Sequence, residues 1–172
     1  MAVSEEMVRK INAQIAAEIY SAYYYLGMAV AFDRMGLKVF SQRFFQQFDE
    51  EMFHARKFLD YLLKVGATVE LEAIRKPPQD WESAEQIIQA ARDHESYVTS
   101  LINALVAQAE EDKDYATRSF LQWYVDEQVE EESSMQELLD LVKMAGPERL
   151  LMVEERLKGM MAAASQAAAQ SE

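Results

Sequence analysis

Residues 46–54 read Gln46-Gln47-Phe48-Asp49-Glu50-Glu51-Met52-Phe53-His54, and they place a carboxylate and an imidazole on an otherwise apolar helix face. Glu51 and His54 are three residues apart, so they lie on the same side of a helix. Stepping alternately by four and three residues traces an apolar stripe, which runs Phe40, Phe44, Gln47, Glu51, His54, Phe58, Tyr61 and Val65. A buried charge is costly unless it is compensated. These residue types favour compensation by a metal ion.

The composition indicates one helical domain over residues 1–172. Glycine and proline are scarce, with five and three residues, and the residues that dominate favour helix. The chain has no cysteine, which excludes disulfides, zinc–thiolate sites and Cys-x-x-Cys iron centres. The net charge of −13 argues against a nucleic-acid partner, because such binding relies on Lys and Arg, whereas an acidic surface attracts cations.

The sequence shows no secretory signal and no membrane-spanning segment. Residues 1–6 lack the basic region and apolar run of a secretory signal. The longest apolar run, residues 19–32, is too short and too polar to span a bilayer. We therefore expect a cytoplasmic protein with no membrane partner.

Four long helices are expected from the capping and stop signals. Ser4, Ser83 and Asp114 stand where they can cap helices, and Gly36 and Gly66 stand where helices end. A fifth, short helix follows Gly146-Pro147, and residues after it are expected to form a frayed tail. The expected ranges are 4–35, 38–65, 83–112, 114–145 and 147–161, with the tail at 162–172.

The connection over residues 67–81 is much longer than the others and contains Pro77-Pro78, which prevent helix there. About fifteen extended residues reach about 50 Å, and a helix of about thirty residues is about 45 Å long. The connection can therefore run the length of a bundle. We expect an all-α four-helix bundle with one long crossover.

Each of the four apolar stripes is interrupted by polar residues near the middle of its helix. Because the centres of packed helices share one layer, these side chains are expected to converge in the core. The alternatives are a buried polar network without metal, or side chains that face solvent. The interruptions are Glu18, Glu51 with His54, Glu95, and Gln128 with Glu131.

The charges of this layer favour a pair of metal ions. Four glutamates supply four negative charges, which two divalent cations would balance. Oxygen ligands with an imidazole suit iron or manganese better than structural zinc. Oxidation of two Fe²⁺ ions adds two positive charges, which a dianion formed from O₂ would balance. Ferrous oxidation is thus the chemistry that the ligand set favours.

Two further residues lie near this layer. Tyr25 is seven residues after Glu18 on the same stripe, so it could hydrogen-bond a ligand carboxylate, donate an electron, or only pack in the core. His94 precedes Glu95 but points about 100° away around the helix, and we interpret it as a surface or packing residue.

Four motifs follow one another along essentially the whole chain. They are Glu18-Ile-Tyr-Ser-Ala-Tyr-Tyr-Tyr25, Glu50-Glu51-Met-Phe-His54, His94-Glu95 and Phe120-Leu-Gln-Trp-Tyr-Val-Asp-Glu127-Gln128-Val-Glu130-Glu131-Glu132. In this order the chain resembles the ferritins, specifically the haem-free bacterial and archaeal kind. The resemblance implies a ferritin-like four-helix bundle with a short fifth C-terminal helix.

The resemblance also implies a ligand set for two irons. Glu18, Glu51 and His54 would hold the first iron. Glu51 would bridge to the second iron, which Glu95 and Glu131 complete.

A third iron site beside this pair is implied by the resemblance alone. Its ligands would be Glu50, Glu127, Glu130 and Glu131, of which only the last lies on an apolar stripe. Without the resemblance, the other three would be interpreted as a solvated acidic face. Gln128 corresponds to a glutamine that lines the two-iron site, and the resemblance places it among the metal-binding residues.

For function, the resemblance implies an iron-storage ferritin with ferroxidase activity. Such proteins assemble about 24 copies into a closed shell, oxidise Fe²⁺ with O₂ or H₂O₂, and store the product inside as hydrated ferric oxide. The expected fifth helix would line one class of pore.

Three alternatives remain at this point. One is a di-iron oxidase or peroxidase of the same fold that protects against oxidative stress without storing iron. Another is a haem-binding bacterioferritin, with Met52 as haem ligand. However, the second Glu-x-x-His of that group is replaced here by Glu127-Gln128-Val129-Glu130, which argues against haem. The last is a helical interaction protein without catalysis.

Overall fold

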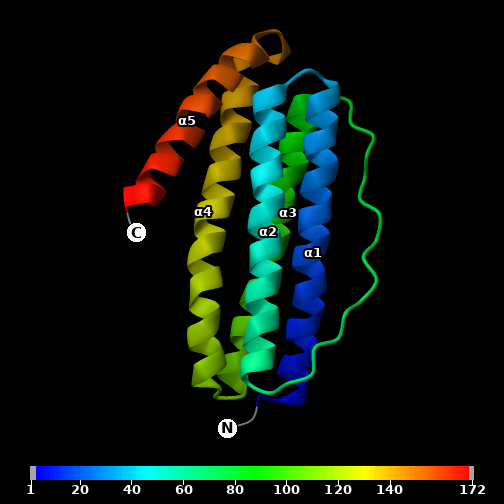
Figure 1. The fold of residues 1–172 in the computed structure, drawn as a ribbon, viewed down its shortest axis with the longest axis vertical. Helices are drawn as coiled ribbons and strands as arrows, with labels where there is room; N and C mark the ends of the chain where they lie inside the picture. Colours follow the sequence, from blue (N-terminus) through cyan, green and yellow to red (C-terminus); the bar gives the residue numbers. More distant parts are fainter. Residues whose placement is uncertain (1–2, 171–172) are drawn as a thin grey trace.

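The computed structural model describes residues 3–170, and the secondary structure of this part of the chain is entirely helical. Four long helices form a bundle, and a fifth leaves its end at an angle (Figure 1). The first four begin and end within one residue of the ranges expected from the sequence. The elements are α1 (Glu5–Arg34), α2 (Lys38–Lys64), α3 (Ala84–Glu111), α4 (Tyr115–Ala145), a 3₁₀ turn η1 (Pro147–Arg149) and α5 (Leu150–Gln170).

The helix starts follow the capping signals. The side chains of Ser4, Ser83 and Asp114 each accept a hydrogen bond from a backbone N–H in the first turn of their helix. Such bonds satisfy donors that a helix leaves without a partner. At the other ends, Gly36 and Gly66 have φ angles of +81° and +72°, a conformation that glycine adopts at little cost.

The start of α2 is capped from another helix. Leu37 precedes α2 and offers no side-chain cap. Instead, the buried Glu154 of α5 accepts hydrogen bonds through Oε1 from the backbone N–H groups of Val39, at 2.7 Å, and Phe40, at 3.2 Å. A carboxylate at a helix N-terminus also interacts favourably with the helix dipole. Glu154 therefore fastens α5 to the bundle.

The fifth helix is longer than expected, and this corrects the sequence-based prediction. Residues 147–149 form the 3₁₀ turn, and α5 then continues through the expected tail to Gln170. The prediction was wrong because residues 162–169 are rich in alanine, which has the highest helix propensity. Val153 and Leu157 of α5 are buried against the bundle, which gives the helix the partner surface that it needs.

The long crossover runs along the outside of α1 from one end of the bundle to the other, so α2 and α3 point the same way (Figure 1). Asn12 of α1 anchors its beginning, because its side chain donates to the Thr68 carbonyl at 3.0 Å and accepts from the Glu70 N–H at 2.8 Å. Further along, a Cβ at Gly27 would lie 3.3 Å from the Pro78 oxygen. The missing side chain lets the crossover lie close against α1.

Two apolar clusters fill the bundle, one on each side of a polar middle layer. Phe32, Phe40 and Phe44 belong to the cluster nearer α5, and Phe58 and Tyr124 belong to the other. Along each long helix, the residues that interrupt the apolar stripe fall between the two clusters. The layer is therefore enclosed by apolar packing above and below.

The expected stripe of α2 is displaced at its end. Val65 is 38% exposed, whereas Leu62 is fully buried. Alternating steps of four and three average 3.5 residues, and a straight helix has 3.6 residues per turn, so a long stripe drifts around the helix. As for membranes, none of the described helices is long and apolar enough to cross one.

Replacing Glu154 by alanine should loosen both α5 and the start of α2. Loss of a helix cap costs about 0.5–2 kcal/mol, so the urea midpoint should fall, and amide exchange of residues 37–41 should accelerate. Glu155→Ala is the matched control, because Glu155 is the exposed neighbour on the same helix. Equal exchange in the two variants would contradict the capping role.

Candidate metal centre

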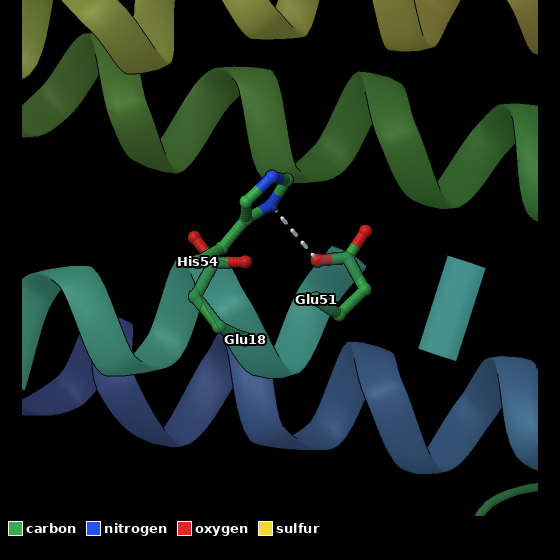
Figure 2. Close-up of side chains that lie close together, drawn as sticks. All are labelled: Glu18, Glu51 and His54. Carbon is green, nitrogen blue, oxygen red and sulfur yellow. Dashed lines mark ion pairs between the residues drawn. The ribbon is translucent and has the colours of Figure 1, made fainter. Parts of the chain in front are cut away.

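The middle layer brings together the Glu-x-x-His pair of α2 and a glutamate of α1. Glu18, Glu51 and His54 are buried, and each offers a ligand atom within 4.8 Å of those of the other two. His54 Nδ1 lies 3.4 Å from Glu51 Oε2. Figure 2 shows the three side chains turned toward one another from the two antiparallel helices. This compact group fits one metal ion with mixed oxygen and nitrogen ligation.

Glu131 of α4 is connected to this group by Gln47. The side-chain amide of Gln47 donates to Glu51 Oε1 at 3.2 Å and to Glu131 Oε2 at 2.9 Å. It thereby holds two carboxylates from different helices beside each other. The sequence placed Gln47 on the apolar stripe but gave it no role. What could have indicated this role is that Gln47 is a polar residue on the apolar stripe, one helical turn before Glu51.

Glu95 of α3 is held from two sides. The Tyr25 hydroxyl donates to its Oε1 atom, and Gln128 Nε2 donates to its Oε2 atom at 3.2 Å. The Thr99 hydroxyl accepts a second hydrogen bond from Gln128 Nε2 and donates one to Glu132 Oε1. Gln128 therefore directs its Nε2 group at Glu95. In this structure it lines the site and holds Glu95, and its role as a metal ligand stays a prediction.

The donors present do not satisfy all the carboxylate oxygens. Gln14 donates to Glu18 Oε1 at 2.9 Å, but Glu18 Oε2 is buried without a hydrogen-bond partner. A buried acceptor without a partner costs about 1–3 kcal/mol. A cation placed between Glu18, Glu51 and His54 would satisfy it, so the residues fit a divalent metal.

Burial also changes the acidity of the layer. It raises the pKa of Glu18 to about 8, with the negative charge of Glu51 as the second cause. The pKa values of Glu95 and Glu131 rise to about 7, again chiefly through burial. Burial, followed by the charges of Glu95 and Glu131, raises the pKa of Glu51 well above its ordinary range. Without metal, the layer therefore retains protons near neutral pH, which cations would displace.

The residues of the expected third site lie side by side at a cavity of about 460 Å³. Glu50 comes from α2, and Glu127, Glu130 and Glu131 come from α4. The cavity is also lined by His54, so it adjoins the buried centre. Helix periodicity alone could not reveal this cluster, because most of its members lie off the apolar stripes.

Two other residues considered from the sequence lie apart from the centre. His94 packs among aromatic rings, with its ring centroid 4.9 Å from that of Tyr24, and its Nε2 atom is 2.8 Å from Ser21 Oγ. Burial lowers its pKa to about 4. This agrees with the interpretation of His94 as a packing residue. Met52 is 41% exposed on α2.

A four-helix bundle with one long crossover, and with carboxylates directed inward from all four helices, is the architecture of the ferritin-like metal proteins. The family model described as ferritin-like domain matches residues 8–145. The chain belongs to the ferritin family. The resemblance noted in the sequence and the expected fold class are both confirmed.

Individual relatives agree with this assignment. The bacterial non-heme ferritin of Bacteroides fragilis is 36% identical over 155 residues, which cover 90% of this chain and 98% of that protein. A probable bacterial non-heme ferritin-like protein of Haemophilus influenzae is 37% identical over 144 residues, covering 84% and 87%. Among solved structures, an open pore ferritin from Archaeoglobus fulgidus superposes with a TM-score of 0.88 at 44% identity, covering 90% and 96%.

The raised pKa values predict how the stability of the metal-free protein depends on pH. Between pH 4.5 and 8 the folded chain retains the Glu18 proton that an unfolded chain has released. The free energy of unfolding should therefore fall as the pH rises through this range. Urea denaturation at pH 5.5, 7.0 and 8.5, at one protein concentration, measures the slope. Glu18→Gln should reduce it, and an unchanged slope would contradict the assignment.

Proposed function

We propose that this chain is an iron-storage ferritin. It oxidises Fe²⁺ at a two-iron centre within each subunit and keeps the product as hydrated ferric oxide inside a multi-subunit shell. The observation that carries the proposal is the buried layer of four glutamates and one histidine, in which Glu18 Oε2 has no hydrogen-bond partner. The family of the chain supports the same conclusion.

The substrate Fe²⁺ would occupy two neighbouring positions in this layer. Glu18, Glu51 and His54 bind the first ion. Glu51 bridges to the second, which Glu95 and Glu131 complete. Four ionised glutamates balance two divalent ions, so binding should release the protons that burial retains in the metal-free layer.

The oxidation transfers one electron from each Fe²⁺ ion to O₂. Two Fe²⁺ ions, one O₂ molecule and two protons then give two Fe³⁺ ions and one H₂O₂ molecule. With H₂O₂ as the oxidant, the same two electrons and two protons give two water molecules. The surrounding residues keep the carboxylates in place: Gln47 holds Glu51 and Glu131, while Tyr25 and Gln128 hold Glu95.

A third iron position is proposed in the adjoining cavity, between Glu50, Glu127, Glu130 and Glu131. Since Glu131 belongs to both groups, iron can pass from the centre to the cavity while it stays bound to the Glu131 carboxylate. Oxygen ligands without nitrogen or sulfur suit a hard ion such as Fe³⁺. The cavity would therefore serve the transfer of oxidised iron.

The shell is proposed to contain about 24 copies with closed symmetry, in the cytoplasm. Helix α5 leaves the bundle at an angle (Figure 1) and exposes Leu151 and Met152, at 69% and 70%. Exposed apolar side chains on a projecting helix favour contact with neighbouring copies. The closed particle would separate the mineral from the surrounding solution.

Iron loading should distinguish storage from oxidation alone. A few hundred Fe²⁺ ions per chain are added in air, and the product is separated on a sizing column that is read for protein and iron together. Iron that elutes with a large particle supports storage. Precipitation of iron beyond the few ions that the binding sites hold would indicate the alternative, a di-iron oxidase without a store.

Glu51→Ala tests the centre itself, because Glu51 is proposed to contact both ions. Loss of residues that merely support a metal ligand costs about 10–100-fold, so loss of this ligand should slow the first rapid oxidation by about a hundredfold or more. Stopped-flow absorbance with two Fe²⁺ ions per chain measures the rate. Glu85→Ala, at an exposed glutamate, is the control. Equal rates would remove this layer from the mechanism.

A further inference from the structure

The acidic cavity between α2 and α4 also contains a positive charge. Arg43 lines it together with Glu50 and Glu131. Its Nη1 atom lies 3.2 Å from Glu50 Oε2, and its side chain is 16% exposed, compared with 47% for Glu50. The Arg43 side chain is therefore the more buried member of the pair, and it lines the cavity together with the carboxylates.

The position of Arg43 follows from the sequence. Arg43 and Glu50 are seven residues apart on α2, which is two helical turns, so both side chains face the same cavity. The carboxylates of α4 complete the wall. A partly buried ion pair is screened less by water and salt than an exposed one. Arg43 therefore places a positive charge within the acidic cluster.

We propose that Arg43 is an internal competitor for cations at this cavity, and that a divalent ion must displace its guanidinium from Glu50 to bind there. The inference rests on the third iron position proposed above. A guanidinium and a metal ion need the same carboxylate oxygens, and they repel each other at short distance. Arg43 thus weakens the third site while leaving its ligands intact.

A second cavity offers space for the displaced side chain. Arg43 also lines a cavity of about 630 Å³ beside α5, where Gln46 and Asp49 contribute polar groups. Asp49 and Glu50 line both cavities, whereas Glu130 and Glu131 line only the first. Rotation of the Arg43 side chain toward α5 can therefore exchange Glu50 for Asp49 and move the guanidinium away from the carboxylates of α4. The backbone of α2 need not move.

The consequence is a site through which iron passes and in which it is not retained. When no cation is present, Arg43 partly neutralises the cluster. When a cation arrives, the unfavourable repulsion shortens its stay. An acidic cluster without Arg43 would bind the ion more tightly and release it more slowly.

Equilibrium dialysis with Fe²⁺ under anaerobic conditions tests this inference without oxidation. We expect the wild type to bind two Fe²⁺ ions per chain tightly and a third weakly. Arg43→Gln should tighten the third step about tenfold and leave the first two unchanged. Arg56→Gln is the matched control, because it removes the same charge from an exposed ion pair on the same helix.

The possible outcomes separate this inference from the function on which it rests. If Arg43→Gln and Arg56→Gln bind the third ion equally, or if neither shows a third ion, the role of Arg43 is overturned. Failure of the wild type to bind the first two ions would instead contradict the two-iron centre. Arg43→Lys retains the charge, so it should keep the third step weak. Tightening in that variant would show that charge is not the cause.

Discussion

The burial of four carboxylates in one layer is the constraint on which this structure depends. A charged group transferred into an apolar core carries a large free-energy cost. The chain supplies donors from Gln14, Gln47, Tyr25 and Gln128, yet one oxygen of Glu18 has none. The layer is therefore balanced either by protons, as the raised pKa values indicate, or by cations. A bundle built for stability alone would place apolar residues here.

The apolar clusters on either side of the layer offset the free-energy cost of its buried carboxylates. Phe32 stacks on Phe40 with ring centroids 5.0 Å apart, and Phe58 stacks on Tyr124 at 3.9 Å. The second pair also acts on the layer directly, since the Tyr124 hydroxyl donates to the His54 carbonyl at 2.8 Å. Packing thus fixes how α2 and α4 are aligned along the bundle axis. This alignment determines whether Glu51 and Glu131 can both accept a hydrogen bond from Gln47.

The bundle and its carboxylate layer could be predicted from the sequence, because both follow from the helical period of the apolar residues. Helices of similar length, each interrupted near its centre, place Glu18, Glu51 and Glu95 in one layer whatever the details of packing. The period says nothing about contacts between side chains of different helices. The N–H group that Gln128 directs at Glu95 depends on Thr99 and Glu132. The cap that Glu154 provides for α2 joins residues more than a hundred positions apart. Neither has a local signal in the sequence.

The two halves of the layer are prepared for metal to different degrees. Glu18, Glu51 and His54 already present their ligand atoms to one point, and Glu18 has an unpartnered oxygen. Glu18 and Glu51 each accept a hydrogen bond, from Gln14 and Gln47, but only Glu18 keeps a buried oxygen without a partner. Glu95 and Glu131 are engaged by Tyr25, Gln128 and Gln47. In the proposed two-ion centre, an ion at the first position would satisfy the free oxygen of Glu18, whereas an ion at the second would only replace hydrogen bonds already made. Two ions entering this layer should therefore bind in order, with the side of His54 filled first.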